Sequence, residues 1–172
     1  MHLGALRNNN TRLGTRLGAD AGFDGIGDFP QASALVRYLD LLDRDGKLPK
    51  TIIYNSNPAD NYVFAAVAGN FPDEAVAGKV QFGSGWWFLD QKEGIERQLN
   101  ALSNVGLLSR FVGMITDSRS FMSYPRHEYF RRVLCNLIGR EIEQGELPHD
   151  LDLAGRMIRN ICHANARDFV RL

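Results

Sequence analysis

Apolar and polar positions along this chain follow two different periods, and their succession predicts alternating strands and helices. Short runs of apolar and β-branched residues predict strands at residues 2–6, 51–54, 79–83 and 110–116. Five stripes of apolar residues, spaced mostly three or four apart, predict helices between and after these strands. The stripes are Leu35, Leu39 and Leu42; Val63, Val67 and Phe71; Ile95, Leu99 and Leu102; Phe130, Leu134, Leu137 and Ile142; and Leu153, Met157, Ile161 and Phe169.

The order of these elements predicts a parallel sheet joined by right-handed crossovers. The strand ends recur at roughly 30-residue intervals, as in a (β/α)8 barrel, and four such units make half a barrel. The first interval is longer because residues 7–30 form a polar, glycine-rich segment, which we expect to be a functional loop. A complete four-stranded doubly wound domain is the alternative, although residues 51–54 and 111–115 would then be apolar strands without edge protection.

Some helix ends and faces can also be predicted. Asn57, directly before a proline, is typical of an N-cap. Asp90 and Glu93 stand three residues apart, as in a capping box at the start of a helix. The basic run near the first closing helix is interpreted as a solvated face, so Arg126 and Arg131 are expected to point to water.

The composition is that of an ordinary globular domain of 172 residues, 44% of them hydrophobic and 23% charged. The 20 basic residues balance the 20 acidic ones, which argues against binding to nucleic acids or membrane surfaces, because both need a basic field. No apolar stretch is long enough to span a bilayer, and no secretory signal is visible. Cys135 and Cys162 form no CxxC motif, so we expect buried, reduced thiols in a cytoplasmic protein.

Side chains capable of chemistry gather at the predicted strand ends, where barrel enzymes place their sites. His2 lies in the first strand and Arg7 just after it; a core histidine and loop hydrogen bonding are the alternatives. Trp86 follows the third strand and could stack on a sugar ring or plug the barrel rim. Asp117 stands where a metal ligand or base is expected, and Arg119 could bind a carboxylate with its fork. An N-cap or a local ion pair would explain these last two equally well.

Longer motifs occur in a fixed order along nearly the whole chain. They are HLGALRNNNT at 2–11, GFD and IGD within 22–28, QFGSGWWF at 81–88, and TDSRSF at 116–121 followed by RHEYFRR at 126–132. Together they resemble the uronate isomerase (glucuronate isomerase) family of the amidohydrolase superfamily.

The resemblance implies an α/β fold, namely the C-terminal half (about four βα units) of a (β/α)8 barrel, which would span residues 1–172 and end in helices. His2 would belong to the fifth barrel strand, Trp86 would follow the seventh, and Asp117 would end the eighth. The N-terminal half of the family, with its His-x-His pair, would be missing. We therefore expect the chain to be inactive alone and to need that half or contacts with another copy.

The resemblance also implies a reaction, the isomerisation of D-glucuronate to D-fructuronate and of D-galacturonate to D-tagaturonate through an enediolate. Asp117, His2 and Arg119 would be catalytic, and Arg7, Trp86 and Arg119 would bind the hexuronate. The superfamily implies Zn²⁺ as a weakly held cofactor, with Asp117 as its ligand. Two alternatives stay open: an inactive remnant or assembly subunit of such a barrel, and a hydrolase of the same superfamily.

Overall fold

The structure is a computed structural model that describes residues 1–21 and 23–170. Gly22, one of the glycines of the predicted loop, lies outside the described residues. The strands are β1 (His2–Leu3), β2 (Ala5–Leu6), β3 (Gly25–Ile26), β4 (Thr51–Asn55) and β5 (Val80–Phe82). The helices are α1 (Thr11–Leu17), α2 (Ala32–Asp43), α3 (Asn61–Gly69), α4 (Lys92–Val105), α5 (Pro125–Glu143), α6 (Leu151–Arg159) and α7 (Asn165–Val170).

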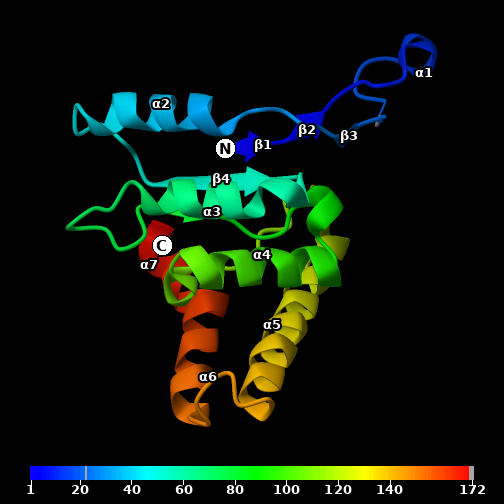
Figure 1. Cartoon of the computed structure of the whole chain (residues 1–172). Coiled ribbons are helices and arrows are strands. Elements are labelled where there is room, and N and C mark those ends of the chain that lie inside the picture. The colour runs from blue at the N-terminus through cyan, green and yellow to red at the C-terminus, as the bar shows by residue number, and fades with distance from the viewer. Residues whose placement is uncertain (22, 171–172) are drawn as a thin grey trace.

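Three parallel strands form the main sheet, in the order β1-β4-β5 (Figure 1). His2 of β1 pairs with Tyr54 of β4, and Thr51 of β4 pairs with Val80 of β5. The predicted parallel pairing is therefore confirmed for three of the four strands. The apolar strand β4 lies in the middle of this sheet and is hydrogen-bonded on both sides, so its lack of edge protection leaves no edge of β4 exposed.

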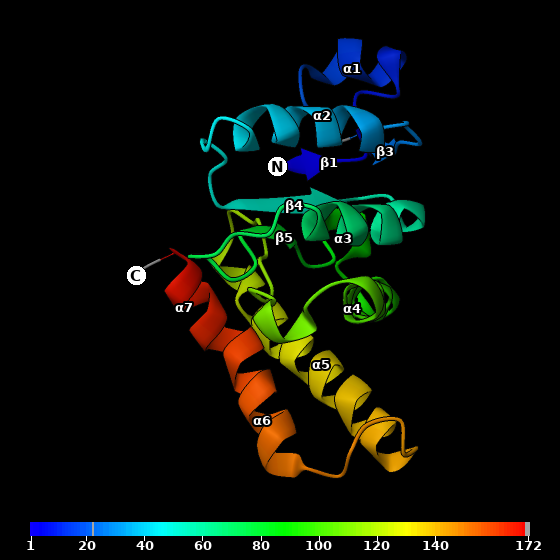
Figure 2. The ribbon, with the colours of Figure 1, turned by 60° about the vertical axis from the view of Figure 1, so that its left-hand side comes forward.

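A kink at Gly4 divides the first predicted strand into β1 and β2. Gly4 has a φ of +79°, and a Cβ atom there would lie 2.9 Å from the Asn55 Oδ1 atom. Beyond the kink, β2 leaves the sheet and pairs antiparallel with β3. Residues 7–30 are therefore a loop only in part, since they contain α1 and β3. No α1 residue is buried, and the segment projects from the body as an arm (Figures 1 and 2).

The fourth predicted strand, at residues 110–116, does not form in the described chain. Gly113 interrupts it with a φ of +81°, and a Cβ atom there would lie 2.4 Å from the Ile161 carbonyl oxygen. Instead of joining a ladder, the Ile115 N–H donates to the Ser84 hydroxyl over 3.3 Å. Residues 1–21 and 23–170 accordingly contain an open sheet and no closed barrel.

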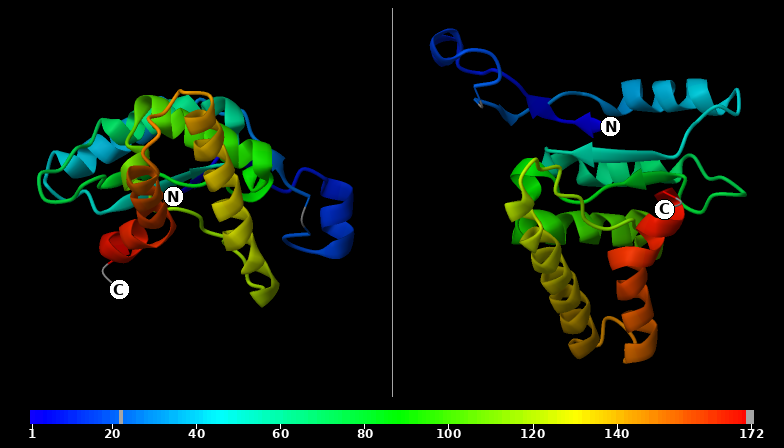
Figure 3. Two further views of the ribbon diagram at one scale, coloured as in Figure 1. Left: turned by 90° about the horizontal axis from the view of Figure 1, so that it is seen from below. Right: turned by 180° about the vertical axis from the view of Figure 1, so that it is seen from behind.

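The hydrophobic core lies between the sheet and the helices on one of its faces (Figure 3, left). α3 packs directly on β4 and β5, and α4 packs on α3. Phe64 of α3 is buried with Ile53 and Phe82 of the strands. The predicted stripe on this helix is partly wrong, because Val63 is 38% exposed and Phe71 is buried only after the helix has ended.

The helix starts follow local capping chemistry. Asn57 accepts a backbone N–H over 3.1 Å and begins a short 3-10 turn, Pro58–Asp60, that leads into α3, so this predicted cap is confirmed. At α4 the predicted cap is displaced by one residue. The Gln91 side chain accepts the Gly94 N–H over 3.2 Å, whereas Asp90 is turned into the protein.

The closing helices pack as the sequence predicts. α5 and α6 run side by side away from the sheet, and a π-helical turn, Asn160–Ala164, joins α6 to α7 (Figures 1 and 3). Arg131 is exposed, as predicted, but Cys135 is exposed rather than buried. The prediction is wrong for one apolar residue of these helices, because Leu153 is 54% exposed. The others are buried or half-buried: Phe130, Leu134, Leu137, Ile142, Met157, Ile161 and Phe169.

Candidate active site

Three side chains from separate parts of the chain meet beside one end of the main sheet. Trp86, which follows β5, donates its indole N–H to the Asp117 Oδ2 atom over 3.0 Å. His2 of β1 stacks on Trp86 with ring centroids 4.4 Å apart, and its Nε2 atom lies 3.7 Å from the same carboxylate oxygen. His2 and Asp117 are each nearly half exposed, so a small molecule could reach both.

The backbone fixes where these side chains point. His2 is held by β1, whose neighbour β4 donates the Tyr54 N–H to the Met1 carbonyl over 2.7 Å. Trp86 has an extended backbone before a short 3-10 turn. Asp117 has a φ of +45°, a left-handed conformation that costs a non-glycine residue about 1–3 kcal/mol. Such strain is concentrated at functional sites, where the surrounding structure holds it in place.

Tyr54 forms a neutral, buried wall behind the cluster. Its ring lies 5.3 Å from the His2 ring, and it covers Gly83, where a Cβ atom would come within 2.4 Å of it. Burial and, to a smaller extent, the negative charge of Asp117 together raise the pKa of Tyr54 to about 12. Sequence reasoning missed this residue, although its place at the end of an apolar strand was a usable signal.

An open cleft of about 510 Å³ lies beside the Asp117 carboxylate. Arg7, Arg119 and Trp86, all predicted from the sequence, line it together with Arg126. Trp86 is 9% exposed and packs into the rim, whereas the neighbouring tryptophan is only half-buried. The prediction that one of the two tryptophans plugs a barrel rim stays a prediction, because the described residues form no barrel.

The two predicted arginines are in different electrostatic situations. Arg7 already pairs with Asp20 over 3.2 Å and with Asp24 over 3.3 Å, and its guanidinium lies 5.6 Å from the Trp87 ring centroid. Arg119 is exposed on the cleft and has no ion pair within the described residues. Its fork is therefore free for an anionic ligand, whereas that of Arg7 is largely occupied.

Arg126 does not face water, contrary to the prediction. It forms an ion pair with Asp90, whose side chain is only 3% exposed, and donates to the Thr116 carbonyl over 3.2 Å. The apolar stripe of α5 could not predict these contacts, because Arg126 lies in the first turn of the helix, where a side chain can reach back to the preceding loop.

Three asparagines near the end of β4 attach the arm to the body, and sequence reasoning missed this network. The Asn55 side chain donates to the Asn57 carbonyl and, over 3.3 Å, to the Asn61 side chain. The Asn57 side chain donates in turn to the Gly27 carbonyl over 3.1 Å. Since Gly27 belongs to the arm, this network helps to place Arg7.

The cluster alone does not fit a zinc ion. Structural and catalytic zinc sites use three or four protein ligands, and no group of three His, Cys, Asp or Glu side chains in residues 1–21 and 23–170 could hold a metal. His2 and Asp117 are two, and Trp86 cannot be a third because its nitrogen donates a proton to the carboxylate. Any zinc bound here would need ligands from outside this chain.

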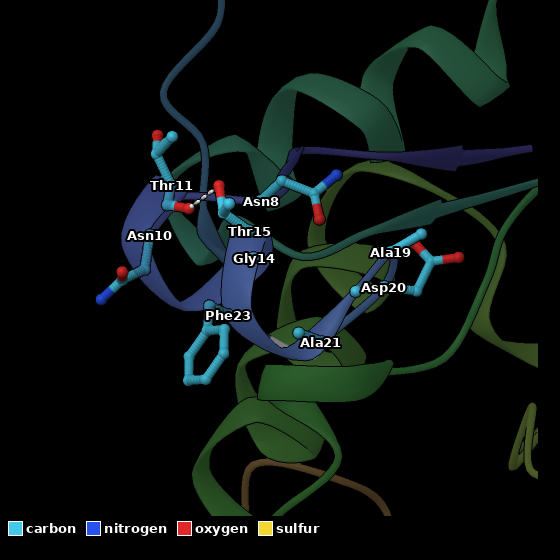
Figure 4. Close-up of a pocket in the computed structure, with 10 residues that line it drawn as sticks. Asn8, Asn10, Thr11, Gly14, Thr15, Ala19, Asp20, Ala21 and Phe23 are labelled. Carbon is cyan, nitrogen blue, oxygen red and sulfur yellow. Dashed lines mark hydrogen bonds between the residues drawn. The ribbon is translucent and has the colours of Figure 1, made fainter.

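A second hollow, of about 410 Å³, lies on the arm around α1 (Figure 4). Its walls come from α1 and its flanking turns alone, and the Asn10 and Asp20 side chains point in opposite directions. The Thr15 hydroxyl is bound to the Thr11 carbonyl over 2.9 Å. Asp20, the charged residue among those lining this hollow, pairs with Arg7, so the hollow offers little chemistry of its own.

A parallel sheet with an imidazole, a carboxylate and a free guanidinium beside one edge is typical of a segment of an α/β enzyme. The comparison with known families is specific. The family model described as glucuronate isomerase matches residues 1–170, and the chain belongs to this family.

None of the described helices has both the length and the apolar character that crossing a membrane requires.

Individual relatives agree with this assignment. The chain is 70% identical over its full length to a uronate isomerase of Opitutus terrae and 66% identical to one of Solibacter usitatus. It covers 36% and 37% of these relatives, so it spans about a third of their length rather than half. A crystal structure of uronate isomerase from Thermotoga maritima is 34% identical, with a TM-score of 0.84 over 98% of this chain and 35% of that one. Glucuronate isomerase from Caulobacter crescentus is 25% identical with a TM-score of 0.80 over 98% and 34%.

Proposed function

We propose that this chain carries one wall of a uronate isomerase active site, which interconverts D-glucuronate with D-fructuronate and D-galacturonate with D-tagaturonate. The observation that carries the proposal is the cluster of Asp117, Trp86 and His2 beside a cleft that also presents Arg119. Family membership supports the same reaction. The free arginine favours an acidic sugar over the neutral amides that hydrolases of this superfamily cleave.

The reaction moves a carbonyl group from C1 to C2 of the sugar. A base removes the proton from C2, the electron pair forms an enediolate, and a proton returns to C1 while the O2 hydroxyl proton passes to O1. Asp117 is the proposed base, because Trp86 holds its Oδ2 atom and leaves Oδ1 for the substrate. His2, whose Nε2 atom lies 3.7 Å from Asp117, would pass the proton from O2 to O1 of the sugar. Arg119 would bind the C6 carboxylate, while Arg7 would mainly shape the cleft.

We also infer that the chain corresponds to later βα units of a (β/α)8 barrel rather than to its first ones. The family's His-x-His pair belongs to the first barrel strand, and no two histidines of this chain are separated by one residue. Among the described residues, β1 and β5 each have one side without a strand partner, on which further strands could add. Catalysis would then require the remaining part of the barrel, supplied by a longer chain or by a separate one.

A chimera tests the proposal directly. The matching 172 residues of the Opitutus terrae enzyme would be replaced by this chain, and the conversion of both hexuronates would be measured. Turnover within about tenfold of the parent, lost on Asp117→Asn, is the expected result. As a matched control, Asp152→Asn changes an exposed carboxylate on α6, away from the cleft, and should leave turnover unchanged.

The second candidate is an inactive subunit that serves assembly only, and the incompleteness of the cluster as a metal site favours it. The two candidate functions are distinguished by mixing this chain with the remaining two thirds of the Opitutus terrae enzyme, produced as a separate protein. Isomerisation that appears only on mixing supports the active-site proposal. A stable complex without turnover, together with an inactive chimera, would leave the assembly role.

A further inference from the structure

One ion pair next to the cleft takes no part in the proposed chemistry, yet it touches both segments that carry this chemistry. Asp90 follows the short turn that begins after Trp86, and Thr116 directly precedes Asp117. Arg126, in the first turn of α5, reaches both segments. Its guanidinium pairs with the Asp90 carboxylate and donates to the Thr116 carbonyl over 3.2 Å.

We infer that Arg126 and Asp90 act as a positioning pair, which holds the Trp86 and Asp117 segments at the separation their hydrogen bond requires. The effect on turnover rests on the proposed function, whereas the effect on the Trp86–Asp117 contact does not. Arg126 is a positioning residue here, because it acts through the two segments and not on the reacting atoms.

The burial of Asp90 makes its partner Arg126, whose own side chain is 35% exposed, difficult to replace. The Asp90 side chain is 3% exposed, and Arg126 is its one ion-pair partner within residues 1–21 and 23–170. A buried carboxylate that loses its cation must move, take up a proton or draw in water. A planar guanidinium can serve a carboxylate and a carbonyl at once with separate N–H groups, whereas a lysine ammonium is a point charge on a flexible stem.

The strained backbone conformation of Asp117 requires contacts that stabilise it. Its φ of +45° is strained, and such a conformation persists only where neighbouring contacts over-determine it. The Thr116 carbonyl bound by Arg126 is one such contact, and the Trp86 indole is the other. Without Arg126, the loop can relax and carry the carboxylate away. A displacement of about 1 Å can lower turnover about a hundredfold.

The first test uses the 172-residue chain itself and an NMR signal. The chain contains two tryptophans, so an ¹⁵N–¹H spectrum shows two indole cross-peaks, which Trp87→Phe assigns. We expect Arg126→Met and Arg126→Lys to move the Trp86 indole peak toward its position in Asp117→Asn and to speed its hydrogen exchange. Arg131→Met, on the exposed face of the same helix, should leave the peak in place. An unmoved Trp86 peak in both Arg126 variants overturns the inference.

The second test separates positioning from stability in the chimera. Arg126→Met alone leaves Asp90 buried and unpaired, and it could lower activity simply by unfolding the protein. The double variant Arg126→Met, Asp90→Leu removes both charges, a replacement that often preserves or restores stability. We expect the double variant to recover its thermal midpoint while kcat stays about a hundredfold low and KM changes little. Recovery of kcat together with stability would reduce the pair to a structural role and overturn the inference.

The two tests also distinguish this inference from the proposed function. If Asp117→Asn leaves turnover intact, the proposed base is wrong, yet a moved Trp86 peak still supports the positioning pair. If Asp117→Asn abolishes turnover while the double variant is fully active, the proposed function stands and the positioning pair fails.

Discussion

Gly113→Ala tests why residues 110–116, just before Asp117, do not form the predicted fourth strand. The wild-type φ of +81° costs alanine about 1–2 kcal/mol, partly offset by about 0.4–1 kcal/mol because alanine restricts the unfolded chain. The new Cβ atom would also lie 2.4 Å from the Ile161 carbonyl oxygen, and crowding against backbone costs about 1–3 kcal/mol. The free energy of unfolding should therefore fall by about 1–5 kcal/mol, with about 3 kcal/mol as the central expectation.

A second glycine provides the control. Gly145 has a φ of +76°, but a Cβ atom added there would meet nothing within 4 Å, so Gly145→Ala should cost about 1 kcal/mol or less. Urea unfolding followed by circular dichroism measures both variants, and an unchanged m-value would show that only stability has changed. The difference between them isolates the crowding against Ile161.

The outcome shows whether close packing of Gly113 against Ile161 prevents the fourth predicted strand from forming. If Gly113→Ala is about as stable as Gly145→Ala, the segment moves away from the π-helical turn without cost. Close packing of Gly113 against Ile161 would then not be what bends the chain, and this explanation for the failure of the fourth strand would be refuted.

Three further predictions concern the site. In the chimera, Asp117→Asn should lower kcat by at least about a hundredfold, since a carboxamide cannot accept the C2 proton; near-normal turnover would exclude Asp117 as the base. Arg119→Met should raise KM far more than it lowers kcat, because the C6 carboxylate is bound equally in the ground and transition states; an equal loss in kcat and kcat/KM would assign it to the reacting centre. Tyr54 should ionise near its pKa of about 12, well above the ordinary tyrosine value, in an ultraviolet titration of wild type compared with Tyr54→Phe. Because the folded state holds this proton more tightly, stability should fall as the pH rises from 10 towards 12, and Tyr54→Phe should remove that loss.

Elements with strong local signals could be predicted from the sequence. β4 is a β-branched, apolar run, and α2 carries a regular stripe through Leu35 and Leu39, so both appear where the pattern puts them. α1 was missed because its seven residues are interrupted by Gly14, although Asn10 does cap it by accepting the Leu13 N–H over 3.0 Å. Propensity alone is a weak guide for so short a helix.

The fourth strand failed for a tertiary reason. Its apolar residues Phe111 and Val112 are buried, as a strand would require, but they pack in a cluster that also holds residues of α5 and the π-helical turn. Asn165 takes up the Phe111 carbonyl through its side-chain amide, over 2.9 Å, in place of a strand partner. An apolar run predicts that residues are buried but does not identify what they pack against. The sequence therefore could not show whether residues 110–116 pair in the sheet or pack against α5 and the π-helical turn.

The candidate site was predictable where it follows from topology. His2 and Trp86 meet because β1 and β5 belong to one parallel sheet and bring both residues to the same edge. Asp117 joins them although residues 110–116 form no strand, because the Trp86 indole holds its carboxylate. Arg126 and Asp90 were misassigned because each fits a local pattern, a helix face and a cap, that their mutual ion pair overrides. A pairing across 36 positions is a property of the folded chain, which local periodicity does not contain.

The charges around the cleft determine which end of a substrate each side chain can take. Arg7 is neutralised by two aspartates and Arg126 by the buried Asp90, so neither has a free positive charge to offer. Arg119 therefore provides the available cation, and Asp117 the available carboxylate, two residues apart on one loop. A ligand that satisfies both must be anionic at one end and must bring an acidic carbon or hydroxyl to Asp117 at the other. A hexuronate has this asymmetry, with a carboxylate at C6 and a proton to be removed at C2, whereas a neutral sugar would leave Arg119 without a partner.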